Sequence, residues 1–171
     1  MSSSTSFQNE ITEKLSRYFQ QVRKEWRITQ DATDAFSTDV DVYAPRIDVA
    51  VGPFNVSEGN ERENITNVFE NSAPQNLKKM IESSSLQKNN NPRCMLAIEV
   101  VYSGSTKHIL GDITNASMIG LYGFVVAHND RIDEVNRIFE YTKTIKAVHK
   151  APSDLFSNVK IMSTNEFLEL L

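Results

Sequence analysis

Two strand-like runs of apolar residues, each interrupted by a single carboxylate, constrain the fold of this chain more than any other feature. Asp48 lies within Arg46–Val51, and Glu99 lies within Leu96–Val101. A carboxylate in a half-buried strand loses hydration and therefore needs a cation, a hydrogen-bond donor or a metal ion nearby. Because side chains alternate along a strand, Glu99 faces the same way as Ala97 and Val101. We therefore expect both acids at the edge of a core, where neighbouring strands could bring them together.

Hydrophobic periodicity divides the chain into alternating helices and strands. Apolar residues at steps of three and four predict helices, and short alternating or fully apolar runs predict strands. The expected helices cover about 7–26, 74–86, 106–119 and 131–149, with a short one near 65–69 and a terminal one after 164. The expected strands are 40–43, 46–51, 94–102, 121–127 and 159–162. This order predicts an α/β fold with a central mixed β-sheet flanked by helices.

The boundaries of these elements follow from single residues. Pro45 separates the runs 40–43 and 46–51, which form either a hairpin or one bent strand. Thr106 and Thr164 are the expected N-caps of their helices. Residues 1–6, rich in serine, are expected to form a disordered lead. Because the rest shows no repeat and no second composition regime, we expect 7–171 to be a single domain.

Composition narrows the range of partners. The net charge of −4 argues against a protein that coats nucleic acid by bulk attraction, although basic residues gather locally in the first helix. No apolar stretch approaches the roughly 20 residues of a membrane span, so no membrane partner is expected. The lone Cys94 cannot form an internal disulfide and is expected to be a small buried residue. With no secretory signal at the start, these features favour a cytoplasmic protein.

The two acids and a nearby lysine are the parts of a metal-assisted phosphodiester hydrolase. Asp48 and Glu99 offer hard oxygen ligands to Mg²⁺, for which Mn²⁺ is the expected substitute. Such an ion polarises the scissile phosphate and lowers the pKa of an attacking water. Lys107 begins the helix that follows the Glu99 strand, where its amine could neutralise charge that develops on the phosphate. The expected catalytic residues are therefore Asp48, Glu99 and Lys107.

The helix that starts near Thr106 carries more polar side chains than packing requires. His108, Asp112 and Asn115 follow the i, i+4, i+7 spacing of one helical face. They either line the cleft and contact a phosphate backbone, or they belong to an ordinary surface in which His108 and Asp112 form a pair.

The stretch from about Arg46 to His128 resembles the PD-(D/E)XK nuclease superfamily, which includes many restriction endonucleases. The resemblance rests on a strand acid, Asp48, and on a second strand acid, Glu99, that leads through a loop into a helix and a further strand. It implies a restriction-endonuclease-like α-β-β-β-α-β core and makes both acids metal ligands. An acid on the first helix sometimes assists in this superfamily, a place that Glu10 or Glu13 could take.

The chain departs from the pattern of that superfamily at three points. Val101 stands where the signature lysine is expected, two residues after Glu99. Pro45 is separated from Asp48, so the proline–aspartate pair is absent. The acids are also far apart, which implies a helical insertion around 74–86. In some members a residue of the following helix takes over the lysine function, and Lys107 is placed for that role.

Three functions are compatible with these residues. The first is a divalent-metal-dependent endonuclease that hydrolyses DNA phosphodiester bonds. It would act as a homodimer or with a partner subunit, since cutting both strands of a duplex usually needs two sites. The second is a catalytically silent nuclease-like module that binds nucleic acid or a partner protein. The third is an unrelated α/β ligand-binding domain in which the acids are structural.

Overall fold

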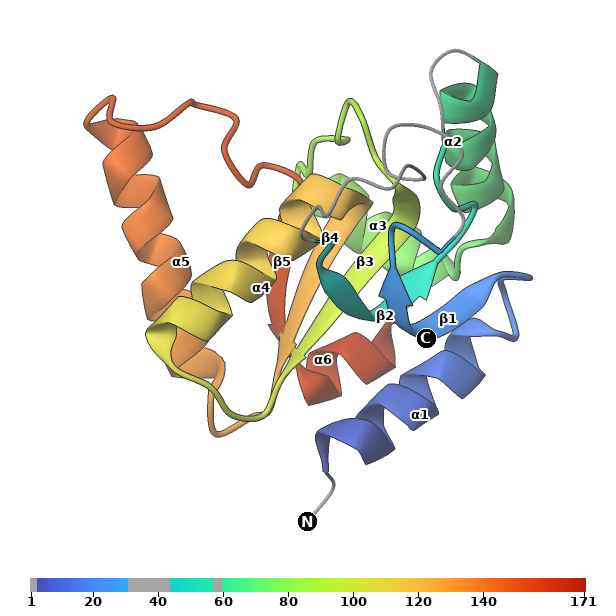
Figure 1. The fold of residues 1–171 in the computed structure, drawn as a ribbon, viewed down its shortest axis with the longest axis horizontal. Coiled ribbons are helices and arrows are strands. Elements are labelled where there is room, and N and C mark those ends of the chain that lie inside the picture. Colours follow the sequence, from blue (N-terminus) through green and yellow to red (C-terminus); the bar gives the residue numbers. More distant parts are fainter. Residues whose placement is uncertain (1–2, 31–43, 57–59) are drawn as a thin grey trace.

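In the part of the chain that the structure describes, a five-stranded mixed sheet with the strand order β1-β2-β3-β4-β5 forms the centre of the protein (Figure 1). The computed structural model describes residues 3–30, 44–56 and 60–171. Neighbouring strands are antiparallel from β1 to β3 and parallel from β3 to β5. The strands are β1 Val22–Arg27, β2 Arg46–Val51, β3 Cys94–Val101, β4 Gly120–Ala127 and β5 Val159–Ser163. The predicted α/β class with a central mixed sheet is therefore confirmed.

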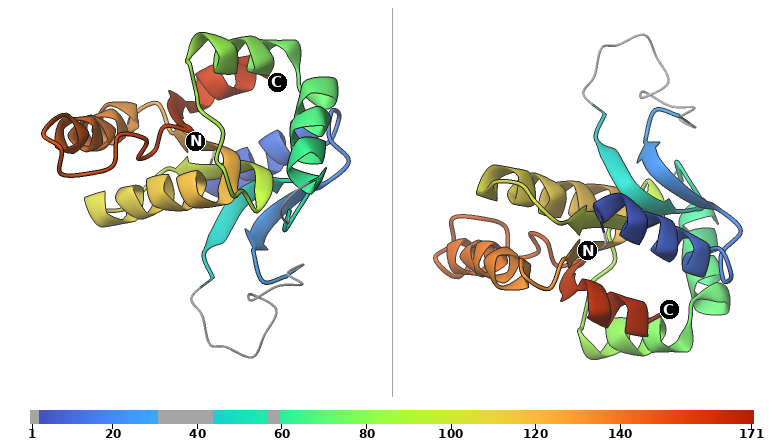
Figure 2. Two further views of the ribbon diagram at one scale, coloured as in Figure 1. Left: turned by 90° about the horizontal axis from the view of Figure 1, so that it is seen from above. Right: turned by 90° about the horizontal axis from the view of Figure 1, so that it is seen from below.

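Helices cover both faces of this sheet (Figure 2). Helices α4 and α5 pack on one face, and α1, α2, α3 and α6 contribute to the core on the other. The helices are α1 Ser4–Leu15, α2 Asn60–Ser72, α3 Gln75–Ser83, α4 Thr106–Ile119, α5 Ile132–Ala147 and α6 Thr164–Glu169. The sheet thus lies between two layers of helices.

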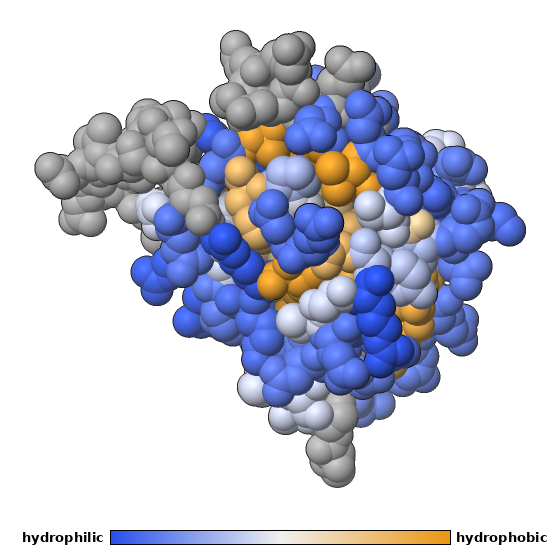
Figure 3. All heavy atoms as spheres, turned by 90° about the vertical axis from the view of Figure 1, so that its right-hand side faces the viewer, coloured by the Kyte–Doolittle hydropathy of each residue, from blue (hydrophilic) through white to orange (hydrophobic). Residues whose placement is uncertain are grey.

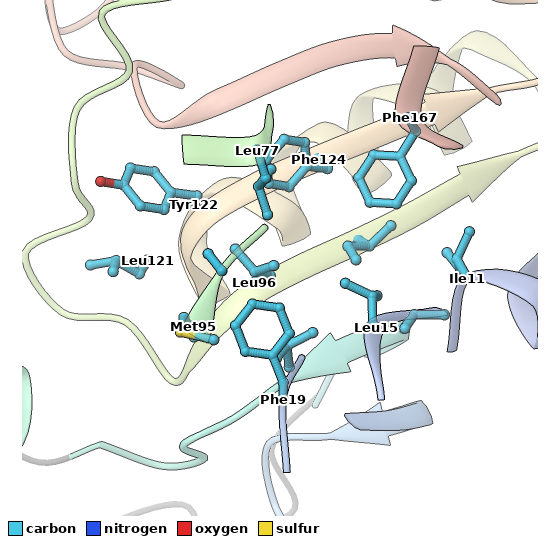
Figure 4. Close-up of a cluster of buried hydrophobic side chains, with 14 of the residues drawn as sticks. Ile11, Leu15, Phe19, Leu77, Met95, Leu96, Leu121, Tyr122, Phe124 and Phe167 are labelled. Carbon is cyan, nitrogen blue, oxygen red and sulfur yellow. The ribbon is translucent and has the colours of Figure 1, made fainter. Parts of the chain in front are cut away.

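The larger core cluster fills the layer that contains α1, α3 and α6. Ile11 of α1, Leu77 of α3 and Phe167 of α6 surround Leu96 and Phe124 of the sheet (Figure 4). Each of these side chains is less than 2 % exposed to solvent. Apolar burial on this scale is the main force that holds the sheet and its helices together.

A second cluster lies between the sheet and the pair α4 and α5. Ile109 and Ile113 of α4 and Val135 of α5 pack against Val101 and Val125. Because Val101 follows Glu99 by two residues, this cluster identifies α4 as the helix that covers the Glu99 face of β3.

The prediction of a helix over 7–26 is wrong beyond Leu15, because α1 ends at that residue. Val22 and Trp26 continue the helical spacing of the apolar residues, but Val22–Arg27 forms strand β1 and pairs along its length with β2. The fully buried Trp26 packs against Phe54, with ring centroids 4.7 Å apart and the ring planes tilted by 36°. Pairing with a strand that lies distant in sequence overrides the local helical pattern.

The N-terminal segment is also more ordered than expected. Helix α1 begins at Ser4, and the Ser3 hydroxyl accepts a hydrogen bond from the Ser6 amide at 3.1 Å. Ser3 is therefore an N-cap, and residues 4–6 are the first turn of a helix. The expectation of a disordered lead over 1–6 is wrong for this part.

The remaining elements lie close to their predicted positions. Helix α2 is longer than the short helix expected near 65–69. The N-caps are Ser105 and Ser163, each one residue before the predicted threonine. Cys94 is buried, as expected. The predicted strand 40–43 lies outside the described residues, and so does the choice between a hairpin and a bent strand at Pro45.

Large apolar side chains also reach the surface at separate places. Leu110 and Met118 of α4 are 39 % and 69 % exposed. On the face that carries α2 and β1, small apolar areas lie between polar side chains (Figure 3). Scattered exposure of this kind is normal for a folded protein.

None of the described helices has both the length and the apolar composition needed to cross a membrane.

Gly123 of β4 is expected to be essential for the close approach of β4 and α4. A Cβ atom at this position would lie 2.6 Å from the carbonyl oxygen of Ala116. We expect Gly123→Ala to lower the free energy of unfolding by about 1–3 kcal/mol, because a backbone group must shift. Gly111→Ala is the control, since a Cβ there meets no atom within 4 Å and alanine favours a helix. Equal stability of the two variants in urea unfolding would contradict this prediction.

Candidate functional site

Strands β2 and β3 place the two predicted acids opposite each other. Val49 pairs with Ile98 and Ala50 with Ala97, so the same register puts Asp48 opposite Glu99. Opposite residues of an antiparallel pair point to the same face of the sheet. The structure therefore brings Asp48 and Glu99 together, as the sequence led us to expect.

The two carboxylates accept hydrogen bonds from backbone amides where β2 and β3 meet. The Val100 amide donates to Asp48 Oδ2 at 2.8 Å, and the Asp48 amide donates to Glu99 Oε2 at 3.2 Å. Each acid thus accepts a backbone hydrogen bond from the opposite strand, which holds both side chains between β2 and β3. These hydrogen bonds offset part of the cost of burial.

Helix α4 adds two further polar side chains to the pair. Asn115 Nδ2 donates to Glu99 Oε1 at 3.4 Å, and the half-buried Asp112 lies within electrostatic range of Asp48 and Glu99. The charge of His108 in turn acts on Asp112. Asp112 and Asn115 of this polar face are therefore directed toward the acids, whereas His108 is exposed and its Nδ1 lies 3.0 Å from the Ser105 hydroxyl.

Strand β1 contributes an acid that the sequence analysis missed. Glu25 lies between the paired positions Lys24 and Trp26, so the register places it opposite Asp48. Its φ of 53° is in the left-handed region, which is strained for a residue other than glycine. One Glu25 oxygen is buried and forms an ion pair with Arg46 Nε at 2.5 Å. Because this segment was expected to be helical, no strand pattern pointed to Glu25.

Burial and mutual repulsion raise the pKa values of three of these acids. Desolvation raises the pKa of Glu99 well above its usual range, and the charges of Asp48 and Asp112 raise it further. The pKa of Asp48 is also raised, first by burial, with opposing effects of the Val100 amide and of Arg46. Burial and the charge of Asp48 raise the pKa of Asp112 to about 6. The site would therefore gain stability from a bound cation.

The third predicted catalytic residue is not brought to the acids. Lys107 is exposed at the start of α4. Successive helical residues turn by about 100°, so Lys107 lies about 140° around the helix from Asp112. Among the described residues, the cation whose charge acts on Asp48 is Arg46. Lys107 remains a prediction, and Arg46 becomes an alternative to it.

The acids of the first helix lie away from the site. Glu10 and Glu13 are exposed on α1, and Glu13 pairs with Arg17 at 3.0 Å. Helix α1 packs in the cluster that contains Ile98 and Val100, on the face of β3 opposite to Glu99. The structure therefore brings neither Glu10 nor Glu13 to the acid pair.

The donor set of Asp48 and Glu99 fits a hard divalent cation. As the side chains lie, the described residues contain no group of three or more His, Cys, Asp or Glu arranged to hold a metal ion. Mg²⁺ usually takes only one or two protein carboxylates, and substrate phosphates and waters complete its coordination. Asp48 and Glu99, two carboxylates with raised pKa values on the same face of the sheet, meet that requirement.

Comparisons of the chain with protein-family models, with curated proteins and with solved structures found no match.

The Asp112 carboxyl is expected to titrate near pH 6 in an NMR pH series. Because the folded state holds this proton more tightly than the unfolded chain does, ionisation lowers the free energy of unfolding as the pH rises from about 4 to about 6. Asp48→Asn should lower the pKa of Asp112, whereas His108→Gln should raise it, since His108 favours the charged form. A shift of the Asp112 pKa in the same direction in both variants would contradict the assigned electrostatic contacts.

Proposed function

We propose that this protein is a Mg²⁺-dependent nuclease that hydrolyses DNA phosphodiester bonds. The observation that carries the proposal is the meeting of Asp48 and Glu99 across β2 and β3, with Asp112 facing both from α4. The order of elements adds support: α1, β1, β2, β3, α4 and β4 follow one another, with α2 and α3 between β2 and β3. With α2 and α3 set aside, this order is compatible with the α-β-β-β-α-β core that the nuclease resemblance implies.

The proposed roles divide the site between ligands and a cation. Asp48 and Glu99 would hold Mg²⁺, or Mn²⁺ in its place, and Asn115 would keep the Glu99 carboxylate in position. When bound there, the ion would supply Lewis-acid polarisation of the phosphate and a water of lowered pKa. A side-chain cation would neutralise charge on the phosphate: Lys107 by the sequence argument, or Arg46 by its place beside Asp48. A homodimer or a partner subunit would supply the second site for a duplex.

The second candidate function is the catalytically silent module. It is favoured by Val101 in place of the signature lysine and by the exposed position of Lys107, about 140° from the acid-facing side of α4. Such a module would keep nucleic-acid or protein binding without hydrolysis. The cytoplasmic location expected from the sequence stays a prediction in either case.

Nicking of supercoiled plasmid DNA distinguishes the two functions. We expect nicking with Mg²⁺ and none with EDTA. If Lys107 supplies the cation, Lys107→Ala slows nicking by about 100-fold and Arg46→Ala has little effect, and the reverse result assigns the role to Arg46. Arg17→Ala is the matched control, because Arg17 is an exposed cation next to Glu13 on α1. Retarded migration of DNA without nicking in the wild type would favour the silent module.

A further inference from the structure

A pocket of about 460 Å³ lies beside the acid pair. Its apolar lining includes Ile28, Met118 and Ile119, and its polar lining includes Thr114 and Asn115. Pockets of this size bind small organic ligands or single groups of larger ones. The pocket is formed where the chain leaves β1, where it approaches β2, by Asn91 and Arg93 just before β3, and by the C-terminal half of α4.

Asn115 joins this pocket to the acid pair. The same side chain lines the pocket and donates to Glu99 Oε1 at 3.4 Å. A helix rises by about 1.5 Å per residue, so Met118 lies about 9 Å along α4 from Asp112. A group in the pocket and a phosphate at the acids could therefore belong to one nucleotide or to two successive ones.

We propose that this pocket receives an unpaired nucleobase of the DNA strand whose phosphate lies at Asp48 and Glu99. The proposal rests on the proposed nuclease function and extends it to a base-binding subsite. A nucleobase has apolar faces, which suit Ile28 and Met118, and a polar edge, which suits the side chains of Thr114 and Asn115. Thr114 Oγ1 donates to the Leu110 carbonyl at 2.7 Å and Asn115 Nδ2 donates to Glu99, so the side-chain oxygens of both residues can still accept a hydrogen bond from such an edge.

A comparison of normal and abasic strands tests the subsite without any cleavage. The affinities of an oligothymidylate strand and of an abasic strand of equal length are measured in EDTA at low salt, by fluorescence anisotropy. For the wild type, we expect loss of the bases to weaken binding roughly tenfold. In Met118→Trp, which fills the pocket from an exposed position, the two strands should bind equally. Leu110→Trp is the control, because Leu110 is exposed on the same helix but lines a different hollow, facing α5.

The outcomes separate the subsite from the nuclease function. The base effect is the ratio of the affinities for the oligothymidylate and the abasic strand. If this ratio is the same in the wild type and in Met118→Trp, the subsite is overturned and the nuclease proposal stands. Loss of the base effect in Leu110→Trp as well would also overturn it, since the effect would not be specific to the pocket. A base effect that survives in Asp48→Asn, together with unchanged plasmid nicking in that variant, would support the subsite while the nuclease assignment to Asp48 fails.

Discussion

Asp48→Asn is expected to slow Mg²⁺-dependent plasmid nicking by about 100- to 1,000-fold. Asparagine preserves the size of the side chain and can still accept the hydrogen bond of the Val100 amide, so the junction of β2 and β3 should stay intact. The substitution removes one of the two anionic ligands that the proposed ion requires. Measured initial rates of nicking, at protein concentrations where the wild type is in the linear range, give the ratio directly.

The second acid should give a similar loss, and the two losses should not add. Glu99→Gln removes the other proposed ligand, and residues that act as one unit show strongly non-additive effects. The double variant should therefore be no slower than the slower single variant. Glu13→Gln is the control, because Glu13 is an exposed acid on the opposite side of the sheet. Wild-type rates in Asp48→Asn and Glu99→Gln would end the catalytic assignment.

Glu99→Gln is also expected to stabilise the metal-free protein by about 1–3 kcal/mol at pH 8. Glu99 is 3 % exposed, and its raised pKa means that the folded state disfavours the ionised form. A neutral amide removes this unfavourable charge and can still bond to the Asp48 amide and to Asn115, whose amide can reverse its orientation. The loss of activity would thus accompany a gain in stability, as at many functional sites.

The pH dependence of this gain identifies its cause. Below about pH 4, Glu99 is protonated in both the folded and the unfolded state, so its unfavourable ionisation is absent. As the pH rises above that value, the wild type alone loses stability, and the difference between the two proteins should grow. Urea unfolding at pH 4 and pH 8 measures both differences. A Glu99→Gln variant that is less stable than the wild type at pH 8 would show that the carboxylate is net stabilising.

Each of the two acids could be singled out from the sequence, because a lone carboxylate is conspicuous in an apolar strand. The alternation of residues around Glu99 also gave the correct face, since Val101 packs toward α4 and Ile98 packs on the other side. The register of β2 and β3 then brought the acids together over a long sequence separation. Local patterns could not supply that pairing, which depends on the tertiary fold.

The rest of the site depends on contacts that local patterns do not encode. Glu25 was missed because Val22 and Trp26 fit a helical spacing, and only pairing with β2 makes this segment a strand. The helical spacing in α4 predicted that Asp112 and Asn115 share one face of the helix. It did not predict which part of the sheet that face packs against. Lys107 is near Glu99 in the chain, yet helical geometry turns it to another side.

Calorimetric titration of Mn²⁺ into the metal-free protein tests the central claim most directly. The claim is that Asp48 and Glu99 together bind one divalent ion between β2 and β3. We expect heat of binding at one site per chain in the wild type and in Glu13→Gln, and no binding at that site in Asp48→Asn or Glu99→Gln. Binding that is the same in all four proteins, or absent from the wild type, would contradict the claim.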